Sequence, residues 1–237
     1  MSIEAKARNY IVAGCRPWNR RVFDEEVSQY PGKWYYFGSP EELNLETVRG
    51  IQPRYIFFLH WSWKVPEVLV ENYECVSFHM TDLPFGRGGT PLQNLIIRGH
   101  SHTKISALRL TRAMDAGPVY IKEDLCMAGS AEEIYLRGTH IAAKIIAWII
   151  REEPQPVAQT GEVTLFRRRQ PKESEVPEIP TLQGLYDFLR MLDAEGYPQG
   201  FLHYKGFRFE FRRAALYNGR IEADVIISPL EKGNKNI

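Results

Sequence analysis

Four short apolar runs, each separated from the next by enough residues for a helix, constrain the fold of this chain more than any other feature. They are Tyr10 to Ala13, Trp34 to Phe37, Tyr55 to Leu59 and Cys75 to His79. Strands that alternate with helical segments are typical of βαβ units, whose strands pair in parallel. The sequence therefore predicts an α/β fold with a Rossmann-like, mostly parallel sheet and helices on both faces.

Changes in composition divide the chain into three predicted parts. Ser130 and Glu133 have the spacing of a capping box, and the helix that they begin is expected to run to about Glu152 and close a first domain over residues 1–153. Residues 154–180 are rich in Pro, Gln and Glu, which predicts a linker with one short hairpin. A helical segment and strands joined at Asn218-Gly219 predict a small C-terminal α+β subdomain over residues 181–237.

Composition excludes several classes of protein. The 30 basic and 29 acidic side chains leave a formal net charge of +1, so no global attraction draws nucleic acid to the chain and we expect no nucleic-acid partner. The N-terminal residues are polar, and the longest apolar helical stretch is interrupted by Lys144. We therefore expect no membrane span and a cytoplasmic location.

Two common kinds of ligand site are not indicated by the motifs. The run AGCRPWNR after the first apolar segment lacks the glycine fingerprint of a dinucleotide site. His100 and His102 form His-x-His, but no carboxylate or cysteine nearby completes a set of metal ligands. We therefore expect neither NAD nor a metal.

A histidine and an aspartate are the candidate catalytic pair. His79 ends an apolar run before a loop rich in Gly and Pro, so its ring is expected in a cleft. Asp115 lies between two further β-rich runs, 105–110 and 118–121, whose ends could bring it beside His79. A carboxylate that orients an imidazole makes histidine an effective general base without a metal. The same residues could instead be a hydrogen-bonded core histidine and a turn-capping aspartate.

The sequence between and around these two residues resembles the N10-formyltetrahydrofolate-dependent formyltransferases, which include methionyl-tRNA formyltransferase and the sugar N-formyltransferases. Members carry Asn-x-His, a loop with Leu-Pro, Arg-Gly and Pro-x-Gln, and an Asp-x-Gly turn. Ser77 stands where their asparagine is expected, and Tyr186 to Phe211 also resembles the closing segment of the sugar enzymes. The other matching residues are His79, Leu83-Pro84, Arg87-Gly88, Pro91-Leu92-Gln93 and Asp115-Ala116-Gly117.

The resemblance implies transfer of a formyl group from N10-formyltetrahydrofolate to the primary amine of a nucleotide-linked deoxyamino sugar. In the implied mechanism His79 accepts the amine proton or polarises the developing oxyanion, Asp115 orients His79, and Asn94 or Ser77 assists the oxyanion. One alternative changes the acceptor to methionyl-tRNA or a carrier-bound aminoacyl group. Another, suggested by Ser77, is a folate- or nucleotide-binding protein without catalysis. Whether the protein forms a homodimer is left open by the sequence.

The resemblance also assigns two ligand-binding sets. Folate is expected where Leu59 to Trp63 and Thr111 to Asp115 follow strand-like runs, because a parallel sheet would place both ends on one rim. The loop from Gly86 to Gly89, which lacks the Lys-Ser/Thr ending of a nucleotide P-loop, is expected beside the amine substrate. The basic run Arg167 to Arg169 is interpreted as a solvated face, with contact to a substrate phosphate as the alternative. The folate set is Leu59, His60, Trp61, Trp63, Thr111, Arg112 and Met114, and the substrate set is Thr81, Gly86, Arg87, Gly88 and Gly89.

Overall fold

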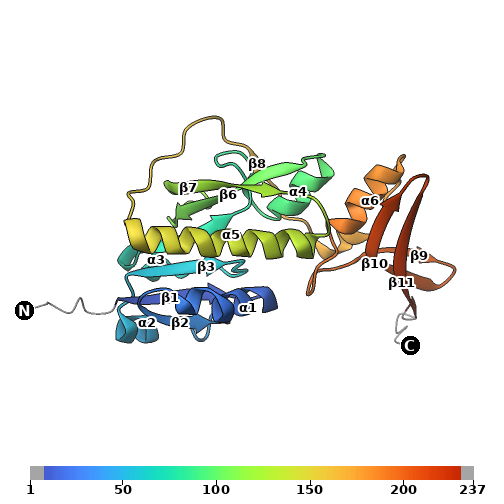
Figure 1. Cartoon of the computed structure of the whole chain (residues 1–237). Coiled ribbons are helices and arrows are strands. Elements are labelled where there is room, and N and C mark those ends of the chain that lie inside the picture. Colours follow the sequence, from blue (N-terminus) through green and yellow to red (C-terminus); the bar gives the residue numbers. More distant parts are fainter. Residues whose placement is uncertain (1–7, 231–237) are drawn as a thin grey trace, which may run out of the picture. The chain divides into compact units, whose positions relative to one another are not determined.

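The computed structural model describes residues 8–230 of the chain (Figure 1). Contacts between residues divide them into two compact units, each assembled from separate segments. The first, here called the sheet unit, holds the described residues up to Gly88 together with Thr103–Leu125 and Leu136–Phe166. The second, here called the hairpin unit, holds Gly89–His102, Cys126–Tyr135 and the described residues from Arg167 onward.

The sheet unit is built on a six-stranded sheet with the strand order β2-β1-β3-β4-β6-β7. Strands β2, β1, β3 and β4 pair in parallel, whereas β6 runs antiparallel to β4. This arrangement confirms the predicted α/β fold with a mostly parallel sheet. The strands are β1 (Asn9–Gly14), β2 (Lys33–Phe37), β3 (Tyr55–Leu59), β4 (Cys75–His79), β6 (His102–Arg109) and β7 (Val119–Cys126).

Local capping signals set where several helices begin. Pro17 is the first residue of its helix, where its missing N–H costs nothing. The side chains of Ser130 and Glu133 each bond the other's backbone, which is the predicted capping box. Asn44 and Thr181 also accept from backbone N–H groups as N-caps. The helices are α1 (Pro17–Glu25), α2 (Leu45–Ile51), α3 (Glu67–Asn72), α4 (Pro91–Ile97), α5 (Ala131–Glu152) and α6 (Leu182–Arg190), with 3₁₀ turns η1 (Val27–Gln29) and η2 (Pro171–Ser174).

Helices pack on both faces of the sheet, because successive side chains of a strand point to opposite sides. On one face Ile56 belongs to a buried cluster that includes Val48 of α2 and Leu69 of α3. On the other face Phe78 of β4 lies with Ala142 of α5 around a small cavity. All five residues of β3 are buried, as expected of a central strand covered on both sides.

The hairpin unit contains an antiparallel three-stranded sheet with β10 in the middle. Its strands are β9 (Gly200–Tyr204), β10 (Phe207–Tyr217) and β11 (Arg220–Pro229), and α6 packs on β10 (Figure 1). The turn from β10 to β11 is the predicted Asn218-Gly219, and Gly219 has a φ of +76° that suits glycine. The predicted small C-terminal α+β subdomain is therefore confirmed.

The short hairpin expected within residues 154–180 does not form as predicted. Instead β8 (Leu165–Phe166) pairs in parallel with β5 (Arg87–Gly88), far back in the sequence. Gly88 permits this pairing, because a Cβ on it would overlap the carbonyl oxygen of Phe166 and its φ is +109°. The pairing is long-range, so the composition of the segment could not reveal it.

Gly117 has no room for a side chain, because a Cβ at this position would overlap the carbonyl oxygen of Arg109. We expect Gly117→Ala to lower the free energy of unfolding by about 1–3 kcal/mol, the usual cost of forcing atoms into a filled space. Urea denaturation measures the change. Gly50→Ala is the matched control, since no described atom lies within 4 Å of its added Cβ and alanine favours the helix α2. A Gly117→Ala curve that coincides with the wild type would contradict the close approach.

Candidate active site

His79 lies at the carboxyl end of β4 with only 8% of its surface exposed. Its Nε2 is 2.8 Å from the carbonyl oxygen of Gly86. A carbonyl oxygen can only accept, so Nε2 carries the hydrogen and donates it. The other ring nitrogen, Nδ1, lies 3.7 Å from Oδ2 of Asp115. In the neutral ring Nδ1 is therefore the nitrogen that can take up a proton, and a carboxylate is close enough to stabilise the resulting charge.

Asp115 is fixed by its backbone conformation and by the loop that precedes α4. Its φ is +50°, in the left-handed region that aspartate tolerates better than most residues. Its Oδ2 accepts a hydrogen bond of 2.9 Å from the backbone N–H of Gly88. The same oxygen thus faces both His79 and the loop, and the structure brings together the two residues of the candidate catalytic pair.

The route by which Asp115 reaches His79 differs from the expected one. Because β6 is antiparallel to β4, Arg109 pairs with Val76 and the N–H of Leu110 donates to the carbonyl oxygen of Cys75. Strand β6 therefore ends beside the start of β4, at the opposite end from His79. The expectation that the segments after β3 and β6 leave from one rim of a parallel sheet is wrong, because an apolar strand pattern does not encode strand direction.

Gln159 holds the turn that carries Asp115, and it is not among the site residues predicted from the sequence. Its Nε2 donates to the carbonyl oxygens of Asp115 and Gly117, both at 2.8 Å. Its Oε1 accepts from the guanidinium of Arg87 at 3.1 and 2.8 Å. Arg87, expected at the substrate, is thus engaged within the protein. Gln159 lies in the segment interpreted as a linker, where no local pattern marks it.

Ser77 and Thr81 flank His79 on the same stretch of chain. Ser77 lies two residues before His79 in β4, so both side chains are on one face of the sheet. The hydroxyl of Ser77 makes no hydrogen bond with the described residues and is available to donate. Thr81 is fully buried, and its Oγ1 lies 3.5 Å from the same Gly86 oxygen that holds His79. Thr81 therefore helps to hold the loop that contains Gly86 in place.

Asn94, the other candidate for the oxyanion, belongs to the hairpin unit, and its side chain is already engaged there. Its Nδ2 donates to the carbonyl oxygens of Gly89, Thr90 and Arg167 at 3.0–3.2 Å, and its Oδ1 accepts from Arg98. Gly89 has no room for a Cβ, because it would overlap the side chain of Arg168. These contacts make Asn94 a loop-stabilising residue within that unit, so Ser77 is the better candidate for the oxyanion.

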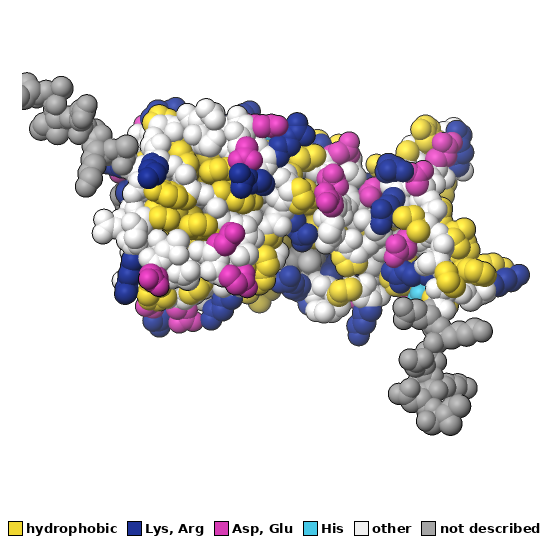
Figure 2. Space-filling model, turned by 90° about the horizontal axis from the view of Figure 1, so that it is seen from below, with side chains coloured by type: hydrophobic (Ala, Val, Ile, Leu, Met, Phe, Trp, Pro, Cys, Tyr) yellow, Lys and Arg dark blue, Asp and Glu magenta, His cyan; other side chains and the backbone are white. Residues whose placement is uncertain are grey.

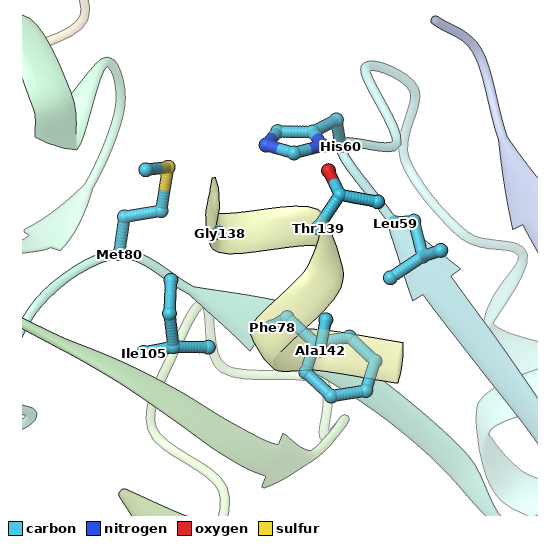
Figure 3. A pocket seen from close by; sticks show the side chains of 8 residues that line it. All are labelled: Leu59, His60, Phe78, Met80, Ile105, Gly138, Thr139 and Ala142. Carbon is cyan, nitrogen blue, oxygen red and sulfur yellow. The ribbon is translucent and has the colours of Figure 1, made fainter. Parts of the chain in front are cut away.

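His60 follows β3 and shapes the wall of a cavity (Figure 3). Its Nδ1 lies 2.9 Å from Nδ2 of Asn19 and accepts from Nε1 of Trp18 at 3.4 Å. Burial, with a smaller contribution from the charge of Arg16, lowers the pKa of His60 to about 4. The ring faces the hydroxyl of Thr139, and the remaining lining is mostly apolar: Leu59, Phe78, Met80, Ile105, Gly138 and Ala142 (Figure 3). His60 is therefore neutral near pH 7.

The other residues assigned to folate lie at or just after the ends of β3 and β6. Trp63 is 46% exposed and its ring packs edge-on against Trp61 at 4.9 Å between centroids. Arg112 forms ion pairs with Glu71 and Glu67 of α3, and Glu67 also pairs with Lys64. The segments after β3 and β6 therefore meet at the same helix. Thr111 bonds the backbone of its own loop, Leu59 is buried, and Met114 is 74% exposed.

Within residues 8–230 no three His, Cys, Asp or Glu side chains are grouped so that they could hold a metal ion. None of the helices described there is long and apolar enough to cross a membrane.

Comparison with known proteins places this geometry in a family. A solved methionyl-tRNA formyltransferase from Clostridium thermocellum is 44% identical to this chain, with a TM-score of 0.89, over 94% of this chain and 99% of that one. The chain belongs to the 10-formyltetrahydrofolate-dependent formyltransferases. The predicted membership in the formyltransferase family is thereby confirmed. The roles of His79 and Asp115 stay a prediction.

More distant formyltransferases match parts of the chain. The family model described as "Methionyl-tRNA formyltransferase, C-terminal domain" matches residues 171–228. Methionyl-tRNA formyltransferase of Wolinella succinogenes is 26% identical over 63% of this chain and 50% of its own length. The chain thus spans about half the length of the curated formyltransferases that it matches. A sugar N-formyltransferase from Shewanella sp. shares the fold at 14% identity and a TM-score of 0.65, over 89% of this chain and 98% of that one.

The pKa of His60 generates a prediction about acid stability. Above pH 6.5 the residue is neutral in the folded and unfolded states, but between pH 6.5 and about 4 only the unfolded chain binds the proton. Stability is therefore lost as the pH falls through this window. We expect the wild type to lose roughly 1–2 kcal/mol more than His60→Gln between pH 7 and 5, a range that allows for the partial exposure of the residue. Equal losses in denaturant titrations at the two pH values would contradict a folded state in which His60 is neutral.

Proposed function

We propose that this formyltransferase transfers the formyl group of N10-formyltetrahydrofolate to a primary amine, with His79 and Asp115 as its catalytic residues. The observation that carries the proposal is the arrangement of the two side chains. His79 Nδ1 lies 3.7 Å from Asp115 Oδ2, while one loop bonds both residues through Gly86 and Gly88. Such a pair can accept a proton and stabilise the charge that results.

The chemistry follows from what each residue can donate or accept. As the amine nitrogen attacks the formyl carbon, negative charge develops on the formyl oxygen and the nitrogen becomes acidic. His79 takes the proton at Nδ1, and Asp115 stabilises the imidazolium. The hydroxyl of Ser77, on the same face of β4, is the proposed donor to the oxyanion. When the bond from the formyl carbon to N10 breaks, His79 returns the proton to that nitrogen as it leaves.

The proposed folate site lies along α3, beside the segments after β3 and β6. The residues there fit a flat, partly polar ring, since Trp63 and Met114 expose apolar surface and the backbone offers donors and acceptors. Asp115 ends the second of these segments, so a donor bound there would bring its formyl group to His79. A folate-binding protein without catalysis fits less well, because it gives the paired His79 and Asp115 no role.

For the acceptor we favour methionyl-tRNA over the nucleotide-linked amino sugar expected from the sequence. The support is the 44% identity, over nearly the whole of both chains, to the C. thermocellum methionyl-tRNA formyltransferase. The sugar N-formyltransferase from Shewanella sp. is much more distant, at 14% identity. The match of residues 171–228 to the C-terminal domain model points the same way.

A nucleotide-linked deoxyamino sugar remains the second candidate. The reasons are the low net charge of this chain and the length over which a sugar enzyme matches it. On the face seen in Figure 2, Lys and Arg side chains are interspersed with Asp and Glu rather than gathered in one basic area. The net charge of +1 gives little long-range attraction for a polyanion. The Shewanella sugar enzyme is also matched over nearly its whole length.

An acceptor assay decides between the two. Purified protein is incubated with N10-formyltetrahydrofolate and either methionyl-tRNA or a panel of nucleotide-linked amino sugars, and formylated product is measured by mass spectrometry. We expect formyl-methionyl-tRNA, at a rate that falls as salt rises because phosphate contacts are screened. Formylation of a sugar with no reaction on tRNA would overturn the choice of acceptor. No product from any amine would overturn formyl transfer itself.

His79 should be essential to turnover but not to folding. His79→Gln retains a side-chain amide that can donate to the Gly86 oxygen but cannot take up a proton. We expect kcat/KM to fall by about 10²- to 10⁴-fold, the usual worth of general-base catalysis. His102→Gln, at an exposed histidine of β6, is the matched control and should stay at the wild-type value. Wild-type turnover by a folded His79→Gln, judged by circular dichroism, would remove His79 from the mechanism.

A further inference from the structure

We propose that Gln159 is a positioning residue that holds Asp115 in place beside His79 during formyl transfer. The inference rests on the proposed function and assigns a role to a residue outside the family motif. Its basis is the set of four hydrogen bonds that join the amide of Gln159 to the Asp115 turn on one side and to Arg87 on the other.

The chemistry of the partners fixes the orientation of this amide. A guanidinium has only donors, so the atom facing Arg87 must be the carbonyl oxygen, Oε1. Backbone carbonyls have only lone pairs, so the atom facing Asp115 and Gly117 must be the NH2 group. Both hydrogens of that group are used, one for each carbonyl oxygen. A flipped amide would lose all four bonds. Among side chains of this length, only glutamine supplies both a carbonyl oxygen that accepts and an NH2 group that donates.

Asp115 needs such support because its backbone conformation is uncommon for a residue other than glycine. Its φ of +50° is a sparsely populated conformation that persists only where neighbouring contacts hold it. Met114, just before it, is 74% exposed. The carbonyl groups bound by Gln159 belong to Asp115 and Gly117, which lie at the two ends of the turn. Gln159 therefore restrains the peptide groups that aim the carboxylate.

Arg87 extends this restraint to the strand that also binds the carboxylate. Arg87 and Gly88 together form β5, and the N–H of Gly88 donates to Asp115 Oδ2. The same two-residue strand thus holds the side chain of Asp115 directly and its backbone through Gln159. We infer that Arg87 acts on the reaction through Gln159 rather than by contact with the acceptor.

Gln159→Glu tests the inference with almost no change in size. The glutamate can still pair with Arg87, but it has no hydrogens to offer the carbonyl oxygens of Asp115 and Gly117. We expect kcat to fall roughly tenfold to a hundredfold, as small misplacements of catalytic groups do, with KM for both substrates nearly unchanged. Gln183→Ala is the control, because Gln183 is an exposed glutamine of α6 whose amide bonds Asp187. Wild-type kcat in Gln159→Glu would overturn the inference.

A double-mutant cycle shows whether Gln159 acts through Asp115. If it does, Gln159→Glu should cost nothing further in an Asp115→Asn background, so the two losses in kcat should be strongly non-additive. Additive losses would overturn the positioning role.

Hydrogen exchange tests the same restraint without any assay of activity. Amides between residues 111 and 118 should exchange faster in Gln159→Glu than in the wild type, while those of β1 and β3 stay protected. Unchanged exchange at 111–118 would overturn the inference. Because this readout needs no formyl acceptor, it separates failure of the Gln159 role from failure of the proposed reaction, which would instead appear as an inactive wild type.

Discussion

The close packing of Gly88 is the constraint on which the rest of the candidate site depends. There is no room for a side chain between its backbone and Phe166, so β5 and β8 can pair only if this residue is glycine. Once that pairing is made, the backbone of the loop is fixed. Its Gly86 carbonyl oxygen then accepts a hydrogen bond from the ring of His79, and its Gly88 N–H donates one to the carboxylate of Asp115. The distance between the side chains of His79 and Asp115 is thus set by backbone atoms of Gly86 and Gly88, which have no side chains.

The antiparallel strand β6 explains why the Asp115 loop needs so many restraints. A parallel strand would have delivered its following loop directly to the end of the sheet where His79 lies. Here the chain leaves β6 beside Cys75 and must return along the sheet before Asp115 is in place. A loop that travels this far has many conformations to lose. Its contacts with α3 through Arg112 and with Gln159 reduce that freedom.

The features that local patterns encode could be predicted from the sequence. The four parallel strands, the capping box of Ser130 and Glu133 and the Asn218-Gly219 turn depend on residues close together in the chain, and each was found. The motif around His79 and Asp115 identified the family. The direction of β6, the pairing of β5 with β8 and the contacts of Gln159 depend on partners distant in sequence. No pattern of apolarity or turn residues records such partners, so these features required the structure.

The division into two units has a consequence for how this protein can be altered. The chain passes from one unit to the other at 88/89, 102/103, 125/126, 135/136 and 166/167. A fragment that stopped at Phe166 would keep two segments of the hairpin unit and lose the third. Exchange of that unit with a relative would therefore require three coordinated replacements rather than one C-terminal cassette. The interleaved chain ties the inheritance of the two units together, because no single crossover can exchange one complete unit and leave the other unchanged.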